Sequence, residues 1–251
     1  MIESPLESLA IVIPTYNEAY NVGEVLQRLS QSYPTALVYV VDDGSPDGTA
    51  DVVRTFAQDR PNFHLIERPG KGGRGSAVVA GFAEALKRLE TRYFLEMDAD
   101  SSHDPDEIPR LIARIDEADV VVGSRYLAQS KIVGWPVNRH MFSRLANVYA
   151  RILLGVPISD YTNGFRLYRR ATLEQVGLAE LRERGYIVLS ETAYKLHNAG
   201  FTFADVPTTF VNRSIGKSNT TMREIMNSFA GIIRIRSAGP RSDARLTQRA
   251  R

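Results

Sequence analysis

Short hydrophobic runs recur through the first half of the chain, and turn-forming residues follow them. The run at residues 9–13 is rich in β-branched side chains and stops at Pro14, and the run at 36–41 stops at Asp42 and Asp43. Three further runs have the same character: residues 63–66, 93–97 and 120–122. Runs this short, apolar and bounded by turn signals predict strands buried in a sheet.

The segments between these runs carry the spacing of amphipathic helices. Apolar residues within 22–29 recur every three or four positions, and the Ser45-Pro46 pair is a start signal for a helix over 47–58. A third helix is expected after a glycine-rich turn and runs to about residue 89. Strands that alternate with helices predict an α/β fold with a mostly parallel, doubly wound central sheet and helices on both faces.

The second half of the chain loses this alternation. A long amphipathic helix is expected at 136–154, and a strand-like segment at 165–168 follows an irregular stretch. The remaining elements are expected in this order: a helix at 190–198, a strand at 201–211 and an amphipathic helix at 222–236. The tail at 238–251 holds four arginines and few apolar residues, a composition typical of disorder.

Composition excludes several classes of protein. The chain has no cysteine, so it has no disulfides or thiolate metal sites, and its formal net charge of +2 gives no whole-chain case for nucleic-acid binding. The acidic, proline-containing start at residues 1–7 is not a secretory signal. No segment approaches the roughly 20 uninterrupted apolar residues of a membrane-spanning helix. We expect a cytoplasmic protein with one domain over 1–237, either soluble or resting on a membrane surface.

Two carboxylates, Asp98 and Asp100, follow the hydrophobic run at 93–97. Open α/β sheets bind ligands at the carboxyl ends of their strands, and side chains two positions apart can converge on one cation there. Hard oxygen ligands of this kind suit Mg²⁺ or Mn²⁺ carrying a phosphorylated substrate. The alternative is a solvated acidic turn in which Asp100 begins a helix cap.

A glycine-rich turn at residues 70–75 lies between a predicted strand and a predicted helix, as phosphate-binding loops do. A Walker loop requires Ser or Thr after Gly-Lys, but Gly72 follows Lys71. A dinucleotide fingerprint belongs to the first strand–helix turn, and this turn is the third. Two interpretations remain: a tight turn that presents Lys71 and Arg74 to an anion, or a surface loop with solvated cations.

Several strand-end motifs fall on one edge of the predicted sheet. They are Ile13-Pro14-Thr15-Tyr16-Asn17-Glu18, Val41-Asp42-Asp43-Gly44-Ser45, Asp98-Ala99-Asp100 and Gly123-Ser124-Arg125-Tyr126. In this order they resemble the GT-A glycosyltransferases of family 2. A second set narrows the resemblance to dolichol-phosphate mannosyltransferases and their bacterial polyprenyl-phosphate relatives: Gly134-Trp135-Pro136, Arg139, Ser143, Asp160 and residues 164–168. The Gln-x-x-Arg-Trp motif of processive polysaccharide synthases does not occur.

The resemblance implies a GT-A fold with a nucleotide-sugar half at about 9–125 and an acceptor half at about 126–237. Asp98 and Asp100 would hold Mg²⁺ or Mn²⁺ against the donor diphosphate, and Asp43 would accept a hydrogen bond from the base or ribose. The other donor-binding residues would be Pro14, Tyr16, Glu18, Val41, Ala99, Ser102, Arg125, Arg213 and Lys217. Lys217 stands two positions earlier than the lysine in the matching motif of related sequences.

The resemblance also implies an acceptor site and a reaction. Arg125, Arg139 and Ser143 would hold a lipid phosphate, and Asp100, Arg125 and Arg139 would act in catalysis. The reaction would be an inverting transfer of mannose from GDP-mannose to a polyprenyl (dolichyl-type) monophosphate. No general base is needed, because a phosphate monoester with a second pKa of about 6 is already an anion near pH 7. Two alternatives stay open: transfer of another hexose, such as glucose from UDP-glucose, and a non-catalytic module that binds nucleotide sugar or lipid phosphate.

One amphipathic segment offers a route to the lipid. An apolar stripe at spacings of three and four is formed by Val137, Met141, Leu145, Val148 and Ile152. A similar stripe lies in the last predicted helix: Met222, Ile225, Met226, Phe229 and Ile233. Such a helix can rest in the headgroup layer of a membrane, or it can be an ordinary helix that faces the core. The first interpretation predicts peripheral contact with the cytoplasmic face of a membrane, with an anchoring partner protein as a further option.

Overall fold

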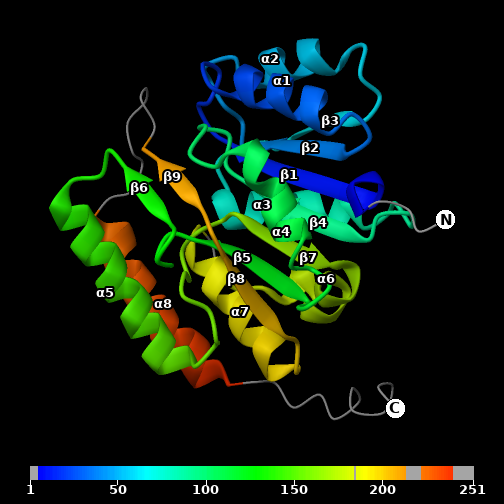
Figure 1. Cartoon of the computed structure of the whole chain (residues 1–251). Helices are drawn as coiled ribbons and strands as arrows, with labels where there is room; N and C mark the ends of the chain where they lie inside the picture. Colours follow the sequence, from blue (N-terminus) through cyan, green and yellow to red (C-terminus); the bar gives the residue numbers. More distant parts are fainter. Residues whose placement is uncertain (1–4, 184, 213–221, 240–251) are drawn as a thin grey trace.

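A seven-stranded sheet forms the centre of the computed structural model, which describes residues 5–183, 185–212 and 222–239 (Figure 1). The strands lie in the order β3-β2-β1-β4-β7-β5-β8. Their bounds are β1 Leu9–Thr15, β2 Leu37–Asp42, β3 Phe63–Glu67, β4 Tyr93–Glu96, β5 Val120–Ser124, β7 Arg166–Arg169 and β8 Phe203–Pro207. All of these pairings are parallel except those of β7, which is antiparallel to both β4 and β5.

Helices cover both faces of the sheet, which explains why its central strands are apolar on both sides. Side chains alternate along β1, so that Val12 packs into one core while Ile11 and Ile13 pack into the other. The Val12 face is covered by α3 Arg74–Ala85, α6 Arg170–Val176 and α7 Ile187–Asn198. The opposite face is covered by α1 Val22–Ser32, α2 Thr49–Ala57 and α4 Ile108–Ile112.

A smaller layer lies beside the carboxyl end of this sheet (Figure 1). It consists of a two-stranded parallel ribbon, β6 Lys131–Val133 with β9 Thr209–Val211, and of the helices α5 Val137–Leu154 and α8 Met222–Ala238. The two helices pack along each other, with the ring of Tyr149 against that of Phe229 at 5.0 Å. No helix among the described residues is both long enough and apolar enough to cross a bilayer.

The fold class predicted from the hydrophobic pattern is confirmed, including the mostly parallel sheet with helices on both faces. One prediction was wrong: the segment at 201–211 is two strands, because β8 pairs with β5 and β9 pairs with β6. The third helix also ends earlier than expected, at Ala85. The pattern did not reveal α4, α6 or β6. Most of the tail expected to be disordered, residues 240–251, lies outside the described residues.

Candidate active site

The strand ends that carry the sequence motifs meet at one edge of the sheet, because β1, β2 and β4 are parallel neighbours. Asp42, the last residue of β2, is buried and holds the turn that follows it. Its Oδ1 accepts hydrogen bonds from Thr15 Oγ1 at 2.9 Å and from Ser45 Oγ at 2.6 Å. Asp42 therefore shapes this corner of the site.

Asp43 ties the same corner to the glycine-rich turn. Its Oδ2 accepts the backbone N–H groups of Gly72 at 3.0 Å and Gly73 at 2.9 Å. Its Oδ1 lies 2.9 Å from Nη1 of Arg68. The carboxylate that the resemblance assigned to the base or ribose thus already anchors the loop beside the donor residues.

The other expected donor residues surround this corner. Pro14 pairs with Val41 across β1 and β2, and the ammonium of Lys71 lies 4.4 Å from the centre of the Tyr16 ring. Glu18 accepts a hydrogen bond from Nδ2 of Asn21 at 2.8 Å. Arg213 and Lys217 lie outside the described residues.

The side chain of Arg74, the first residue of α3, points toward the carboxyl end of β4 instead of into solvent. Its Nε donates to Asp98 Oδ1 at 2.8 Å and its Nη1 to Glu96 Oε2 at 2.9 Å. Burial lowers the pKa of Arg74, but the charges of Asp98 and Glu96 outweigh it and raise the pKa above its ordinary value. The expectation of a solvated or ligand-facing Arg74 was therefore wrong, because the buried carboxylate of Glu96 and the half-buried carboxylate of Asp98 attract it.

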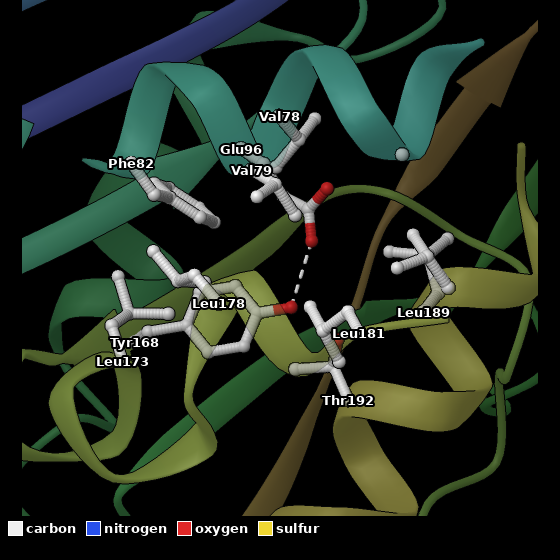
Figure 2. A pocket seen from close by; sticks show the side chains of 12 residues that line it. Val78, Val79, Phe82, Glu96, Tyr168, Leu173, Leu178, Leu181, Leu189 and Thr192 are labelled. Carbon is white, nitrogen blue, oxygen red and sulfur yellow. Dashed lines mark hydrogen bonds between the residues drawn. The ribbon is translucent and has the colours of Figure 1, made fainter. Parts of the chain in front are cut away.

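Glu96 carries this network into the interior (Figure 2). Its Oε1 accepts a hydrogen bond from the hydroxyl of Tyr168 at 2.7 Å, inside a cavity that α3, β4, β7 and α7 line mostly with apolar side chains. Burial, and then the charge of Glu96, raise the pKa of Tyr168 well above its ordinary value. The hydroxyl is therefore a fixed donor that keeps Glu96 oriented toward Arg74.

Asp98, Ala99 and Asp100 form a turn at the end of β4 that is largely shielded from solvent. Asp100 is 9% exposed and its Oδ1 accepts the backbone N–H of Ser102 at 3.1 Å. The turn-capping bond of the alternative interpretation is thus present, but the turn is not solvated. The hydroxyl of Ser102 is buried beside these carboxylates and has no hydrogen-bond partner within the described part of the chain.

His103 holds the same turn from behind, a role that the sequence analysis did not assign. The backbone N–H of Asp98 donates to its Nδ1 at 2.9 Å, so the ring proton resides on Nε2, which lies 2.8 Å from Oδ1 of Asn163. Nδ2 of Asn163 donates to the carbonyl oxygen of Gly123 at 2.6 Å. A neutral imidazole, stacked on Phe165, therefore connects the ends of β4 and β5.

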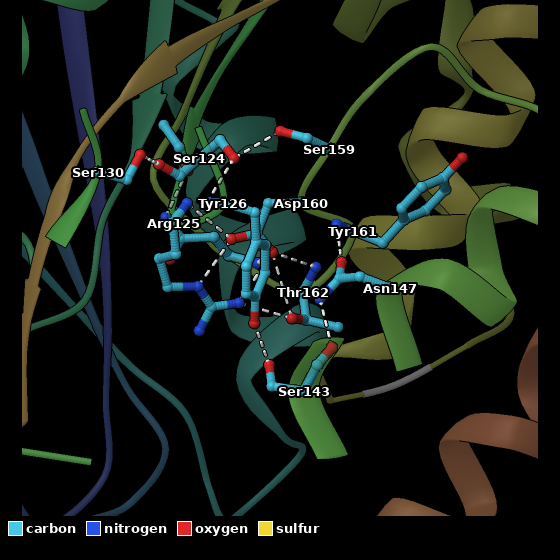
Figure 3. A network of polar contacts seen from close by, with 12 residues as sticks. Ser124, Arg125, Tyr126, Ser130, Ser143, Asn147, Ser159, Asp160, Tyr161 and Thr162 are labelled. Atoms are coloured by element: carbon cyan, nitrogen blue, oxygen red, sulfur yellow. Dashed lines mark hydrogen bonds and ion pairs between the residues drawn. The ribbon is translucent and has the colours of Figure 1, made fainter. Parts of the chain in front are cut away.

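Arg125 and Asp160 form a second buried pair, at the end of β5 (Figure 3). Nε and Nη2 of Arg125 donate to the two carboxylate oxygens at 2.7 and 2.8 Å, and Nη2 also donates to Thr162 Oγ1 at 2.6 Å. Burial alone would raise the pKa of Asp160, but the charge and hydrogen bonds of Arg125 hold it below its ordinary value. The guanidinium is thus fixed in place before any substrate arrives.

Arg139 and Ser143, the residues expected to hold the lipid phosphate, lie near this pair on α5. The guanidinium carbon of Arg139 lies 4.1 Å from the ring centre of Trp135, and its Nη1 donates to Asn212 Oδ1 at 3.0 Å. Ser143 accepts a hydrogen bond from the hydroxyl of Tyr126 at 2.5 Å (Figure 3). Tyr126 directly follows Arg125, so the structure brings Arg125, Arg139 and Ser143 into one region.

The residues at the end of β4 fit a divalent cation that arrives with a diphosphate. They offer hard carboxylate oxygens from Asp100 and from Asp98, whose Oδ1 is paired with Arg74, and next to them lies the buried hydroxyl of Ser102, which has no partner among the described residues. The described residues contain no group of three or more side chains that could hold a metal alone. Mg²⁺ is usually bound by one or two carboxylates together with substrate phosphates, so this set suits such a cation.

Comparison with known proteins identifies the family of this chain. The family model "Glycosyl transferase family 2" matches residues 10–177. The chain is 39% identical over 227 residues to the polyprenol monophosphomannose synthase of Mycolicibacterium smegmatis, an alignment that covers 88% of this chain and 85% of that protein. The chain belongs to glycosyltransferase family 2.

A second relative of this family 2 glycosyltransferase is the undecaprenyl-phosphate mannosyltransferase of Micrococcus luteus, which is 41% identical over 207 residues, or 82% of this chain and 85% of that protein. Glucosyl-3-phosphoglycerate synthase from Mycobacterium tuberculosis, solved with Mn²⁺, UDP and phosphoglyceric acid, shares the fold with a TM-score of 0.66 and 18% identity over 94% of this chain and 80% of that chain. Mannosyl-3-phosphoglycerate synthase from Rubrobacter xylanophilus gives a TM-score of 0.63 and 18% identity over 96% and 76%. The family resemblance noted in the sequence is confirmed.

Proposed function

We propose that this glycosyltransferase transfers mannose from GDP-mannose to a polyprenyl monophosphate, with inversion at the sugar carbon. The observation that carries the proposal is its similarity to two proteins named for mannose transfer to polyprenyl phosphates, over 88% and 82% of the chain. The clustering of Arg125, Arg139 and Ser143 supports it, because this region can accommodate the phosphate of such an acceptor.

In the proposed reaction, an oxygen of the acceptor phosphate forms a bond to the anomeric carbon of mannose while the bond from that carbon to the GDP oxygen breaks. The electron pair of the broken bond leaves with GDP. No proton has to be removed from the nucleophile, because the phosphate is already an anion near pH 7. The protein therefore needs to hold two anions close together and in line for displacement.

The two arginines, buried Arg125 and half-buried Arg139, suit this task because their donors are fixed in advance. The Asp160 carboxylate fixes the plane of Arg125, and Trp135 and Asn212 fix Arg139. Positive charge held rigidly beside a reacting phosphate stabilises charge as it develops in the transition state. We assign Asp98, Asp100 and Ser102 to the donor diphosphate and its Mg²⁺ or Mn²⁺. When bound, such a cation stabilises the negative charge of the leaving group.

We further propose that α5 rests on the cytoplasmic face of a membrane. The structure exposes its apolar stripe, whereas an ordinary core-facing helix would bury it. Relative exposures are 75% for Val137, 59% for Met141, 59% for Leu145, 55% for Val148 and 76% for Ile152. Exposed cations, including Arg144 and Arg151, lie on the same helix and can meet anionic headgroups.

The second amphipathic helix adds less to this argument. In α8, Ile233 is 54% exposed, while Phe229 packs against Tyr149 of α5. The side chains of Met222, Ile225 and Met226 lie outside the described residues. An anchoring partner protein remains a further proposal, since the exposed stripe of α5 offers an apolar surface to one.

A panel of sugar nucleotides tests the proposed function. The purified protein is incubated with each donor, a polyprenyl phosphate and Mg²⁺, and the release of nucleoside diphosphate is measured. GDP-mannose should give the fastest release, and release should depend on the lipid phosphate. Faster release from UDP-glucose would replace mannose with glucose, and tight binding without release from any donor would support the non-catalytic alternative.

A further inference from the structure

Trp135 lies close to the guanidinium groups of two arginines, Arg125 and Arg139. It is the only tryptophan in the chain and stands two residues before the start of α5. The guanidinium carbon of Arg139 lies 4.1 Å from its ring centre and that of Arg125 lies 5.3 Å from it. Phe210 of β9 packs edge-on against the same ring at 5.3 Å. A cation over an indole face is attracted to it, so the ring holds both guanidinium groups in place.

The indole N–H of Trp135 has no acceptor within the described part of the chain. Its Nε1 is buried, and no described residue provides it with a hydrogen-bond partner. Buried donors in folded proteins are nearly always paired, and an orphaned one often marks the place of a missing water or ligand. The surrounding side chains cover this N–H, so an incoming oxygen reaches it only when one of them shifts.

We propose that Trp135 belongs to the acceptor-phosphate site: its ring positions Arg139 and Arg125, and its N–H donates to an oxygen of the bound phosphate. This inference rests on the proposed function, since it names a further residue for that acceptor. An anion suits the place because two guanidinium groups and the amino-terminal end of an 18-residue helix converge there.

The surroundings also specify the kind of anion. The exposed apolar stripe of α5 begins at Val137, two residues after Trp135. A ligand whose phosphate meets the indole can therefore lay an apolar chain along the helix. This combination fits a lipid phosphate monoester better than the diphosphate of a nucleotide sugar, whose expected residues lie at the ends of β1, β2 and β4.

Steady-state kinetics test the proposal through Trp135→Phe, which keeps an aromatic ring and removes the N–H. We expect the KM for polyprenyl phosphate to rise roughly tenfold or more, the loss typical of a hydrogen bond to a charged group, with the KM for GDP-mannose unchanged. Tyr149→Phe is the matched control, because it removes an aromatic hydroxyl from the α8 side of the same helix. Its KM for both substrates should equal that of the wild type.

Fluorescence of the single tryptophan gives a second reading that does not depend on a variant folding. In detergent micelles, polyprenyl phosphate should change the emission of the wild-type protein saturably, with a midpoint near its KM, whereas the corresponding polyprenol should not. Arg139→Ala should weaken this response.

Two results would overturn the inference and leave the proposed function intact. One is a wild-type enzyme that transfers mannose but shows no change in emission with polyprenyl phosphate, and the other is a Trp135→Phe enzyme with wild-type KM. An equal response to polyprenol would assign the change to the lipid tail and likewise overturn it. Absence of mannose transfer by the wild type would instead refute the proposed function.

Discussion

Arg74 and Asp98 form an ion pair that joins the glycine-rich turn to the acidic motif at the end of β4. The Nε–Oδ1 distance is 2.8 Å, and the Arg74 side chain is 9% exposed. The residues just before Arg74, Gly72 and Gly73, bind Asp43 through their backbone. One loop therefore connects the acidic group near the expected nucleoside pocket with the acidic group expected at the metal.

We expect Arg74→Ala to destabilise the protein strongly. It would remove the guanidinium that pairs with Glu96, whose side chain is 2% exposed. Breaking a buried pair by removing one partner typically costs about 3–5 kcal/mol. Urea unfolding followed by circular dichroism measures the change. Arg54→Ala is the control, because Arg54 pairs with Asp51 and Glu67 in solvent, and its unfolding midpoint should stay close to that of the wild type. An equal, small effect of both substitutions would contradict the structural role of Arg74.

Asp100→Asn should lower the rate of mannose transfer by about two orders of magnitude or more, as expected for the loss of a group that stabilises transition-state charge. The wild-type enzyme should require Mg²⁺ or Mn²⁺ and lose activity in EDTA. Initial rates across a metal titration make the measurement. Asp106→Asn, in the short 3-10 helix Pro105–Glu107 that follows this loop, with a side chain 69% exposed, should keep wild-type activity. Full activity of Asp100→Asn in EDTA would remove the metal from the proposed function.

The pair of Asp160 with Arg125 should make stability depend on pH in the acid range. The pKa of Asp160 is held below the ordinary aspartate value of 3.8, so its ionised form stabilises the folded state above that pH. This stabilisation is lost as pH falls from about 3.8 through the lower folded pKa. Asp160→Asn should therefore be less stable than the wild type at neutral pH, and the difference should shrink below pH 3.8. Urea unfolding at each pH gives the free energy of unfolding of both proteins. A difference between wild type and variant that stays constant with pH would contradict this prediction.

Asp205 should behave in the opposite sense. Burial raises its pKa, its Oδ1 has no partner among the described residues, and its Oδ2 accepts the N–H of Ser159 at 2.7 Å. Ionisation of Asp205 therefore destabilises the folded state above its raised pKa. Asp205→Asn keeps an acceptor for Ser159 and removes the charge, so it should stabilise the protein at neutral pH and less so in acid. A lower unfolding midpoint at pH 7 would show that the carboxylate is needed as a charge.

Membrane association should depend on the apolar stripe of α5. Replacing Met141 and Leu145 together by Glu should weaken binding to vesicles that contain anionic lipid at least tenfold, because burying one such side chain is worth about 1.5–3 kcal/mol. Co-sedimentation across lipid concentrations gives the affinity. Leu89→Glu is the control, since Leu89 is 83% exposed but lies outside α5. Equal loss of binding for both variants would point to a general charge effect, and no loss for the double variant would argue against membrane contact through α5.

Periodicity alone was enough to place the parallel core of the fold. Residues 9–13 and 36–41 are apolar at every position, and strands buried on both faces require such runs. Asp43 and Gly44 marked where β2 stops, but Pro14 did not mark the end of β1, because that strand continues through it to Thr15. The break between β8 and β9 escaped prediction because it depends on which strand each half pairs with. Pairing partners lie far apart in the sequence, so local propensity carries no information about them.

The identities of the strand-end residues likewise predicted where the candidate site lies, but not the hydrogen bonds and ion pairs within it. Asp98, Asp100, Arg125 and Arg139 were all named from motifs, and the fold brings them to one side of the sheet. The roles of His103 and Asn163 could not be found in this way, because a lone His or Asn in a polar stretch gives no sign of being buried. The position of His103, three residues after Asp100, was the only local signal. Its partner Asn163 lies 60 residues further along the chain, so the contact between them could not be predicted.

The sequence by itself determined the family and most of the secondary structure of the core, and it named candidate site residues, since these depend on local pattern and on residue type. Only the tertiary structure decided how the charges are shared. It paired Arg74 with Asp98 and Arg125 with Asp160, and it exposed the apolar stripe of α5. Each of these outcomes follows from burial, which a residue inherits from its distant neighbours. A charge removed from water must find an opposite charge there, and an apolar face left without a neighbour remains exposed.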